Sequence, residues 1–289
     1  MHAPPDFIGI GAPKAGTTWL YYQLKDHPDL WLPPVKELHY FNWPRFPRLG
    51  KALVKKTLHG RHVRTALARG LQKGQLTWTY RYLLQNRTTE NYQRLFPAKS
   101  SKLVGEITPS YAQMEEEQIQ ALAKYSPDCK LIYILRNPVD RVWSHLNMVN
   151  LVGSQSTPLA AEQVFQRLNT RTLEASHYLQ NLTHWERYFG NEQIFIGFYE
   201  DLKQREEWFL AEICSFLGVS KQLPLTFGAA TSRRAQNQGT YQDFPLDYQR
   251  EITQRLLPEI QALHTRLQHP HTGEWLAQAE EILKVGKQP

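Results

Sequence analysis

The sequence predicts an α/β protein with a P-loop-like parallel sheet and helices on both faces. Three apolar runs of β-type residues support this prediction, at 6–11, 130–135 and 194–199, and each is followed by a turn and a helical pattern. A fourth, shorter strand is predicted at 103–106. Strands that are apolar on both faces and separated by helices are typical of parallel sheets between helical layers.

The first two strands each lead into a helix. The first run ends at Gly11 and passes through a tight loop with Pro13 into a helix over 17–24. The second run leads into a helix over 139–146, and Pro138 just before it suits a first helical turn. Both units therefore read as strand, loop and helix.

The third strand also leads into a helix. Phe209, Ile213 and Phe216 recur at helical spacing on one face, and Gly218 follows them. Glycine is the usual residue just past a helix end, so we expect the helix to stop there.

Length and composition predict one domain over 1–289, in which 42–100 is a basic, mainly helical insertion or cap near the acceptor site. The 289 residues, 41% of them hydrophobic, supply a sizeable core. The chain has neither an apolar run of bilayer length nor a secretory pattern at its start, so we expect a soluble cytoplasmic protein, or a soluble domain of a larger one. Two cysteines without metal spacing predict buried free thiols.

The net charge of +7 is concentrated in one segment. No acid occurs from Leu38 to Thr89, whereas eleven bases do: Arg45, Arg48, Lys51, Lys55, Lys56, Arg61, Arg64, Arg69, Lys73, Arg81 and Arg87. Removing these eleven from the 34 Lys and Arg leaves 23, against 27 acids. Such a field attracts an anionic partner, although a charge run alone is more often a solvated helical surface.

Residues 11–18, reading GAPKAGTT, form a phosphate loop by position. They follow a strand and open a helix, where backbone N–H groups and the helix dipole can hold an anion. Nucleoside triphosphate loops carry a lysine directly after the second glycine, but Thr17 stands there. The lysine is Lys14, inside the loop, which favours contact with a single phosphate group and its bridging oxygen.

A second anion site is predicted after the second strand. Arg136 follows that strand, and Ser144 lies two helical turns along the next helix, with Arg141 between them. A planar guanidinium and a hydroxyl can converge on one doubly charged phosphate.

Together, residues 13–18 and 136–144 resemble the 5′-phosphosulfate and 3′-phosphate loops of sulfotransferases that use 3′-phosphoadenosine 5′-phosphosulfate (PAPS). Further similar strings follow the order of the carbohydrate and bacterial branch: 36–41 (KELHYF), 105–111 (GEITPSY), Tyr178 with Leu182 and Trp185, 198–202 (FYEDL) and 216–218. The resemblance implies the sulfotransferase fold and in-line transfer of a sulfuryl group from PAPS to an acceptor hydroxyl, with adenosine 3′,5′-bisphosphate as product and no required metal.

The resemblance also implies roles for individual residues. Lys14 would stabilise the leaving 5′-phosphate, and Glu37 would take the proton of the acceptor hydroxyl, with Glu106 and His39 as alternative bases. His145 and His177 are interpreted as packing or surface residues. The implied cofactor-binding set is Lys14, Ala15, Gly16, Thr17, Thr18, Trp19, Arg136, Ser144, Arg233, Gln238 and Gly239. The implied acceptor-side set is His39, Glu106, Tyr111 and Tyr178.

Two departures from the branch leave the acceptor open. Ile107 stands where many carbohydrate-sulfating relatives have lysine, and Gln238 stands where their last cofactor loop often has lysine. Arg233 or Arg234 could replace the second charge. We expect an anionic acceptor that bears a hydroxyl, either a glycan or a hydroxyacyl group on an acyl carrier protein.

Two other functions compete. A P-loop kinase or NTPase would need Mg²⁺-dependent ATP binding. A nucleic-acid-binding module would use the basic segment with Trp43, Trp78 and Tyr80 for stacking. The second alternative explains none of the phosphate-loop residues, so we disfavour it.

Overall fold

The computed structural model describes residues 4–42, 76–97, 101–148, 170–221 and 244–284. The centre of the fold is a five-stranded sheet with the order β2-β3-β1-β4-β5, in which every neighbouring pair is parallel. The strands are β1 (Phe7–Gly11), β2 (Leu30–Trp31), β3 (Leu103–Ile107), β4 (Lys130–Leu135) and β5 (Ile194–Phe198). The predicted α/β class with a parallel sheet is confirmed.

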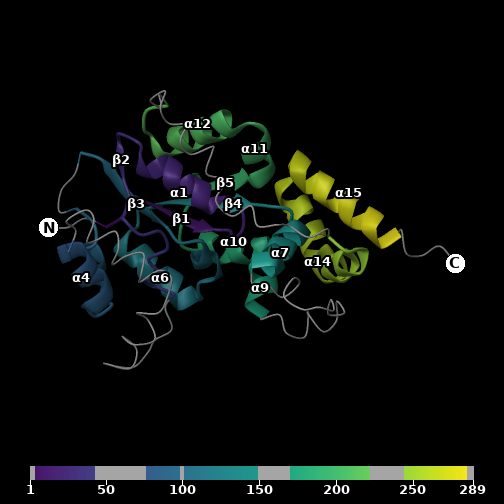
Figure 1. Ribbon diagram of the computed structural model, residues 1–289, viewed down its shortest axis with the longest axis horizontal. Helices are drawn as coiled ribbons and strands as arrows, with labels where there is room; N and C mark the ends of the chain where they lie inside the picture. The colour runs from purple at the N-terminus through teal and green to yellow at the C-terminus, as the bar shows by residue number, and fades with distance from the viewer. Residues whose placement is uncertain (1–3, 43–75, 98–100, 149–169, 222–243, 285–289) are drawn as a thin grey trace.

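Helices cover both faces of this sheet (Figure 1). On one side lie α1 (Thr17–Lys25), α11 (Tyr199–Gln204) and α12 (Glu206–Leu217). The other side carries α6 (Glu116–Tyr125) and α10 (Tyr178–Glu186). The remaining helices are α4 (Leu76–Leu84), α5 (Thr89–Gln93), α7 (Pro138–Met148), α9 (Thr170–Glu174), α14 (Leu246–Leu267) and α15 (Pro270–Lys284), with short 3₁₀ turns η1 (Pro109–Gln113) and η2 (Asn191–Gln193).

The helix predicted after the third strand is divided into α11 and α12. The break lies at Arg205, whose φ of −142° and ψ of 54° are not helical. Of the three residues predicted on one helix face, Phe209 and Ile213 are buried and Phe216 is half-buried. Gly218 ends α12 in the left-handed conformation, and its N–H bonds the carbonyls of Cys214 and Ser215. The predicted helix stop is therefore confirmed.

The core fills the space between the sheet and both helical layers. All five residues of β1 are buried, as expected for the central strand of a parallel sheet. On α10, Tyr178, Leu182 and Trp185 point into the core from one face. Both cysteines are buried free thiols, as predicted.

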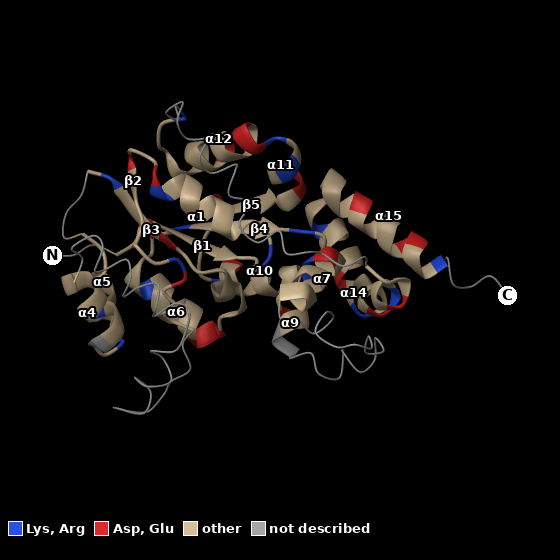
Figure 2. Ribbon diagram, viewed as in Figure 1, with Lys and Arg blue, Asp and Glu red and all other residues tan. Residues whose placement is uncertain are grey.

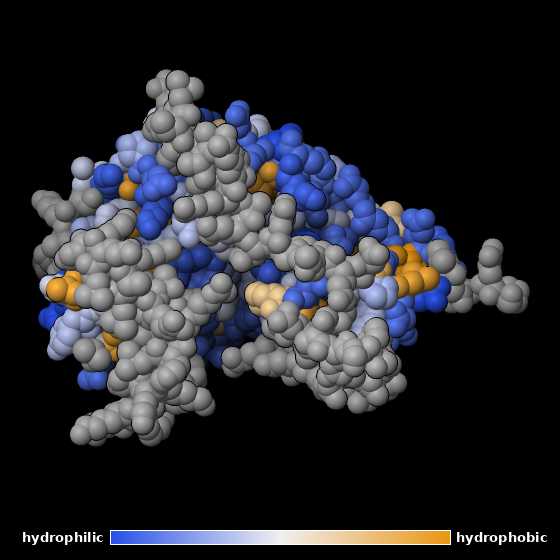
Figure 3. Space-filling view, viewed as in Figure 1, coloured by the Kyte–Doolittle hydropathy of each residue, from blue (hydrophilic) through white to orange (hydrophobic). Residues whose placement is uncertain are grey.

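The described surface is mostly hydrophilic on the face shown in Figure 3. Basic and acidic residues alternate along α14, whereas α15 carries three acidic residues and one base, Lys284, at its end (Figure 2). Within the described ranges, no helix combines the length and the hydropathy needed to cross a membrane.

Candidate active site

Several of the predicted site residues lie at the carboxyl edge of the three central strands. Lys14 follows β1 and Arg136 follows β4, while the backbone N–H of Glu37 donates to the carbonyl of Ile107, the last residue of β3 (3.0 Å). Because β3 and β4 flank β1 on opposite sides, this edge is the point where the strand order reverses. Open α/β sheets bind ligands at such a point.

The loop over 12–16 is shaped for an anion. Gly16 has a φ of +81°, and a Cβ there would lie 2.4 Å from a methyl carbon of Leu202. Glycine is therefore required both by conformation and by the close approach of α11. Gly16 is also the N-cap of α1 and offers no side chain to the first-turn N–H groups, at Thr17 and Thr18, that a helix leaves without intrahelical partners. The N-terminus of this nine-residue helix and the lysine before it fit a phosphate group.

Unusual backbone conformations mark the same site. Four non-glycine residues of the described chain have positive φ, and three of them are Lys14 (71°), Glu37 (66°) and His39 (50°). Each costs about 1–3 kcal/mol and persists only where the surroundings enforce it, and such residues cluster at functional sites.

Arg136 joins the two predicted phosphate loops directly. Its Nη1 donates to the carbonyl of Lys14 (3.0 Å), and its guanidinium lies 4.8 Å from the ring centre of Tyr199 on α11. The hydroxyl of Tyr178 donates to the Arg136 carbonyl (2.9 Å). The fully buried Tyr178, predicted on the acceptor side, therefore contacts the backbone of the cofactor-side loop.

The start of α7 is held by its neighbours. Asn137 caps the helix, because its Oδ1 accepts from the N–H of Val139 (2.9 Å). Arg141 is fully buried, and its Nε donates to the hydroxyl of Ser176 (2.6 Å) while its Nη2 donates to the carbonyl of Thr172. Ser144 is buried one turn further along. These contacts fix the direction of the helix that carries the second predicted anion site.

His145, interpreted from the sequence as a packing or surface residue, is half-buried on α7. Burial together with the charges of Arg141 and Lys14 lowers its pKa to about 4, so the imidazole is neutral at neutral pH.

The segment over 36–42 presents the predicted base. Lys36 pairs with one carboxylate oxygen of Glu37, and His39 Nε2 lies 3.4 Å from the other. Burial alone would raise the pKa of Glu37, but hydrogen bonds and charge from His39 and Lys36 outweigh it and hold the pKa at about 2. Glu37 is therefore a carboxylate at neutral pH.

Glu106 and Tyr111, predicted on the acceptor side, lie beneath this segment. Both are buried, and Glu106 accepts hydrogen bonds from the hydroxyls of Tyr92 (2.5 Å), Thr108 (2.7 Å) and Tyr111 (3.3 Å). Burial raises the pKa of Glu106. The Tyr111 oxygen in turn accepts from the N–H of Tyr40 (2.7 Å). This network anchors the segment over 36–42, which carries Glu37, to β3.

The described part of the basic segment packs on the same residues. Arg87, in the turn between α4 and α5, donates to the carbonyls of Leu38 (3.3 Å) and His39 (3.2 Å). The Tyr40 hydroxyl donates to the carbonyl of Thr88 (2.7 Å). Residues 76–97 therefore also hold the segment over 36–42 in place.

Other predicted residues are placed less directly. Trp19 lies on α1 behind the loop, and its indole N–H donates to Glu206 at the start of α12 (2.6 Å). Arg233, Gln238 and Gly239 lie outside the described residues, as does the basic stretch over 43–75. In the described parts of the chain, no three His, Cys, Asp or Glu side chains are grouped as a metal site.

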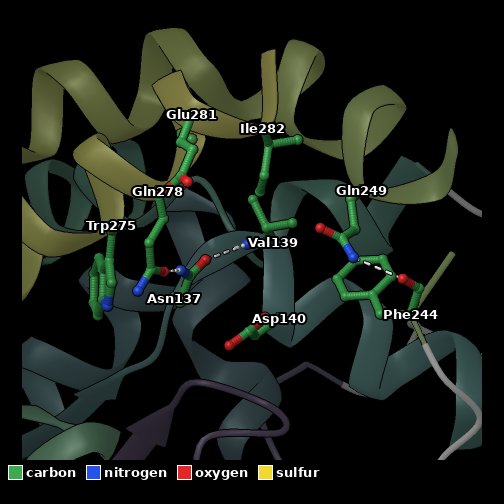
Figure 4. A pocket seen from close by; sticks show the side chains of 10 residues that line it. Asn137, Val139, Asp140, Phe244, Gln249, Trp275, Gln278, Glu281 and Ile282 are labelled. Atoms are coloured by element: carbon green, nitrogen blue, oxygen red, sulfur yellow. Dashed lines mark hydrogen bonds between the residues drawn. The ribbon is translucent and has the colours of Figure 1, made fainter. Parts of the chain in front are cut away.

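A cavity of about 310 Å³ lies beside the start of α7 (Figure 4). Asn137 and Asp140 line it from below, and Trp275, Gln278 and Glu281 of α15 line it from above. Asn137 Nδ2 donates to Gln278 Oε1 (2.9 Å) across it. Its charged lining consists of carboxylates, so it does not suit a phosphate group.

Comparison with known proteins defines the class of this fold and site. A profile of the sulfotransferase family matches residues 5–222. The chain belongs to this family, and it is therefore a transferase.

Individual relatives agree with this assignment. Membrane-associated sulfotransferase kil1 of Dictyostelium discoideum is 30% identical over 57% of this chain and 27% of its own length. Carbohydrate sulfotransferase 15 of Mus musculus is 24% identical over 91% of this chain and 52% of its own. This chain thus spans between about a quarter and a half of these two proteins. The crystal structure of a sulfotransferase from Alicyclobacillus acidocaldarius has a TM-score of 0.65 at 23% identity, covering 94% of this chain and 99% of that one.

Proposed function

We propose that this protein transfers the sulfuryl group of PAPS to an acceptor hydroxyl. The contact between Arg136 and the Lys14 carbonyl is the observation that best supports this proposal, because it joins the two loops that are predicted to bind anions, at one sheet edge. A donor such as PAPS, with one phosphate on the 3′ and one on the 5′ position of its ribose, matches two such loops. Use of PAPS is typical of the family.

The residues divide between the two ends of the reaction. Transfer forms a bond between the acceptor oxygen and sulfur and breaks the bond between sulfur and the bridging oxygen of the 5′-phosphate. Lys14 and the N-terminus of α1 would stabilise the negative charge that grows on that phosphate. Glu37, already ionised, would accept the proton of the hydroxyl.

We expect Arg136→Ala to weaken adenosine 3′,5′-bisphosphate about 10- to 100-fold, the range for losing a charge-assisted hydrogen bond. Adenosine 5′-phosphosulfate lacks the 3′-phosphate, so its binding should change far less. Calorimetric titration of both ligands without added metal measures the difference, and Arg187→Ala, which removes an exposed arginine paired with Glu116, is the control. Equal losses for the two ligands would refute the assignment of Arg136 to the 3′-phosphate.

For the acceptor, we propose an anionic molecule recognised by the basic segment. The contacts of Arg87 with the backbone of Leu38 and His39 support this idea, because they place part of that segment beside Glu37. The name of one relative, carbohydrate sulfotransferase 15, indicates a carbohydrate acceptor for that protein, which makes a glycan one candidate here. A hydroxyacyl group on a carrier protein is the other, since Ile107 is less polar than the lysine of many glycan-directed relatives.

Neutralising Lys55, Lys56, Arg61 and Arg64 together should raise the KM for an anionic acceptor and flatten its dependence on salt, because positive charges attract an anion over a distance and ions screen that attraction. The affinity for PAPS should stay nearly constant. Steady-state kinetics with acidic glycans, acyl carrier substrates and neutral alcohols at several ionic strengths test this. If the acceptor KM changes neither with salt nor with the four substitutions, the proposed anionic acceptor is wrong, and neutral alcohols or phenols become the candidates.

A further inference from the structure

The imidazole of His39 is held between two polar groups, one at each ring nitrogen. Nε2 faces the Glu37 carboxylate at 3.4 Å. Nδ1 lies 3.1 Å from the hydroxyl oxygen of Ser110, in η1, and 3.3 Å from Oδ1 of Asn42. Ser110 and Asn42 also contact each other, because Asn42 Nδ2 donates to the Ser110 oxygen (2.7 Å).

These contacts determine where the proton of a neutral His39 lies. The Ser110 oxygen accepts from Asn42, so its own hydrogen is available for Nδ1. Rotating the Asn42 amide by half a turn would instead place its NH₂ against Nδ1. As the Asn42 amide stands, its Oδ1 could accept from a protonated Nδ1, whereas the Ser110 hydroxyl can donate to an unprotonated one. The contacts at Nδ1 thus allow either tautomer, and the contact at Nε2 decides between them.

The opposite tautomer is disfavoured by charge. A proton on Nδ1 would leave the lone pair of Nε2 facing the carboxylate of Glu37, which is ionised at neutral pH. The other charged groups near His39 are Lys36, bound to Glu37, the buried Glu106, and Arg87, which donates to the His39 carbonyl. Among the described residues, Ser110 and Asn42 lie at Nδ1.

We propose that Ser110 and Asn42 are positioning residues that fix His39 as the Nε2–H tautomer, so that this N–H orients the Glu37 carboxylate toward the acceptor hydroxyl. This inference rests on the proposed sulfuryl transfer for its catalytic part, but the tautomer itself does not. The φ of 50° at His39 is consistent with a residue that its surroundings hold in place.

Nitrogen-15 NMR of protein with labelled histidine tests the tautomer without any substrate. Eleven histidines give signals, and His39→Gln identifies the one to follow. For the neutral imidazole of His39, we expect Nε2 protonated and Nδ1 unprotonated in the unaltered protein. Ser110→Ala should give a mixture of tautomers, and Asn42→Asp should draw a proton to Nδ1. A proton on Nδ1 of the unaltered protein would overturn the inference.

Kinetics test the positioning role. Ser110→Ala should lower kcat about tenfold, the effect of losing one hydrogen bond, with KM for PAPS nearly unchanged. Ser110→Thr, which keeps the hydroxyl, should restore kcat, and Ser215→Ala, at an exposed serine of α12, is the matched control. If Ser110→Ala changes the tautomer but leaves kcat intact, the positioning role is wrong. If the unaltered protein shows the expected tautomer but no sulfuryl transfer, the proposed function fails instead.

Discussion

Lys14→Ala should lower kcat by two or more orders of magnitude, similar to the loss of one preorganised donor from an oxyanion site. The ammonium group stands in the loop that ends at the N-terminus of α1, where the charge of a leaving phosphate would develop. Lysine and alanine are both strained at the φ of 71° found here, so the substitution removes the charge without relieving the backbone. Single-turnover measurements with saturating PAPS isolate this effect from binding.

Lys124→Ala is the matched control for this experiment, because Lys124 is exposed on α6, away from the loop. It should leave kcat within about twofold. Thermal unfolding of both variants checks that the fold is intact. Near-normal turnover by Lys14→Ala would exclude a role for this lysine at the leaving group.

The layers of the fold could be predicted because their signals are local. Apolar runs such as those ending at Gly11 and Leu135 predict buried strands from residue type alone. The strand β2 was missed because it has only two residues, Leu30 and Trp31, which are too few to show the alternation of a strand. The break at Arg205 was missed because the polar run over 203–207 contains no glycine or proline to mark it, and only backbone angles reveal the interruption.

The site could be predicted less completely, because its contacts join residues that are distant in sequence. The phosphate loop was visible as a string, but the contact from Arg136 to the Lys14 carbonyl spans 122 positions. Glu106 and Tyr111 were expected beside the acceptor. The structure shows their polar atoms hydrogen-bonded to Tyr92, Thr108 and the backbone of the segment over 36–42. Burial and hydrogen bonding of this kind have no local sequence signal.

Glu37→Gln should lower kcat by about 10²- to 10⁴-fold, the usual contribution of a general base. Glutamine keeps the size of the side chain but cannot accept the proton, and it removes the negative charge that pairs with Lys36 and His39. The binding of adenosine 3′,5′-bisphosphate should hardly change, since the predicted cofactor contacts come from other loops. Glu280→Gln, at an exposed position of α15, is the matched control.

The pH profile of the unaltered enzyme gives an independent test of Glu37. Because its pKa is held at about 2, the carboxylate stays ionised as pH falls from neutrality, and its ability to accept a proton is lost only when pH approaches that value. In kcat/KM, which reports ionisations of the free enzyme, Glu37 should therefore produce no acid limb between about pH 5 and 8. An acid limb in that range that disappears in Glu37→Gln would show that the carboxylate titrates near neutrality, and that Lys36 and His39 do not hold it ionised.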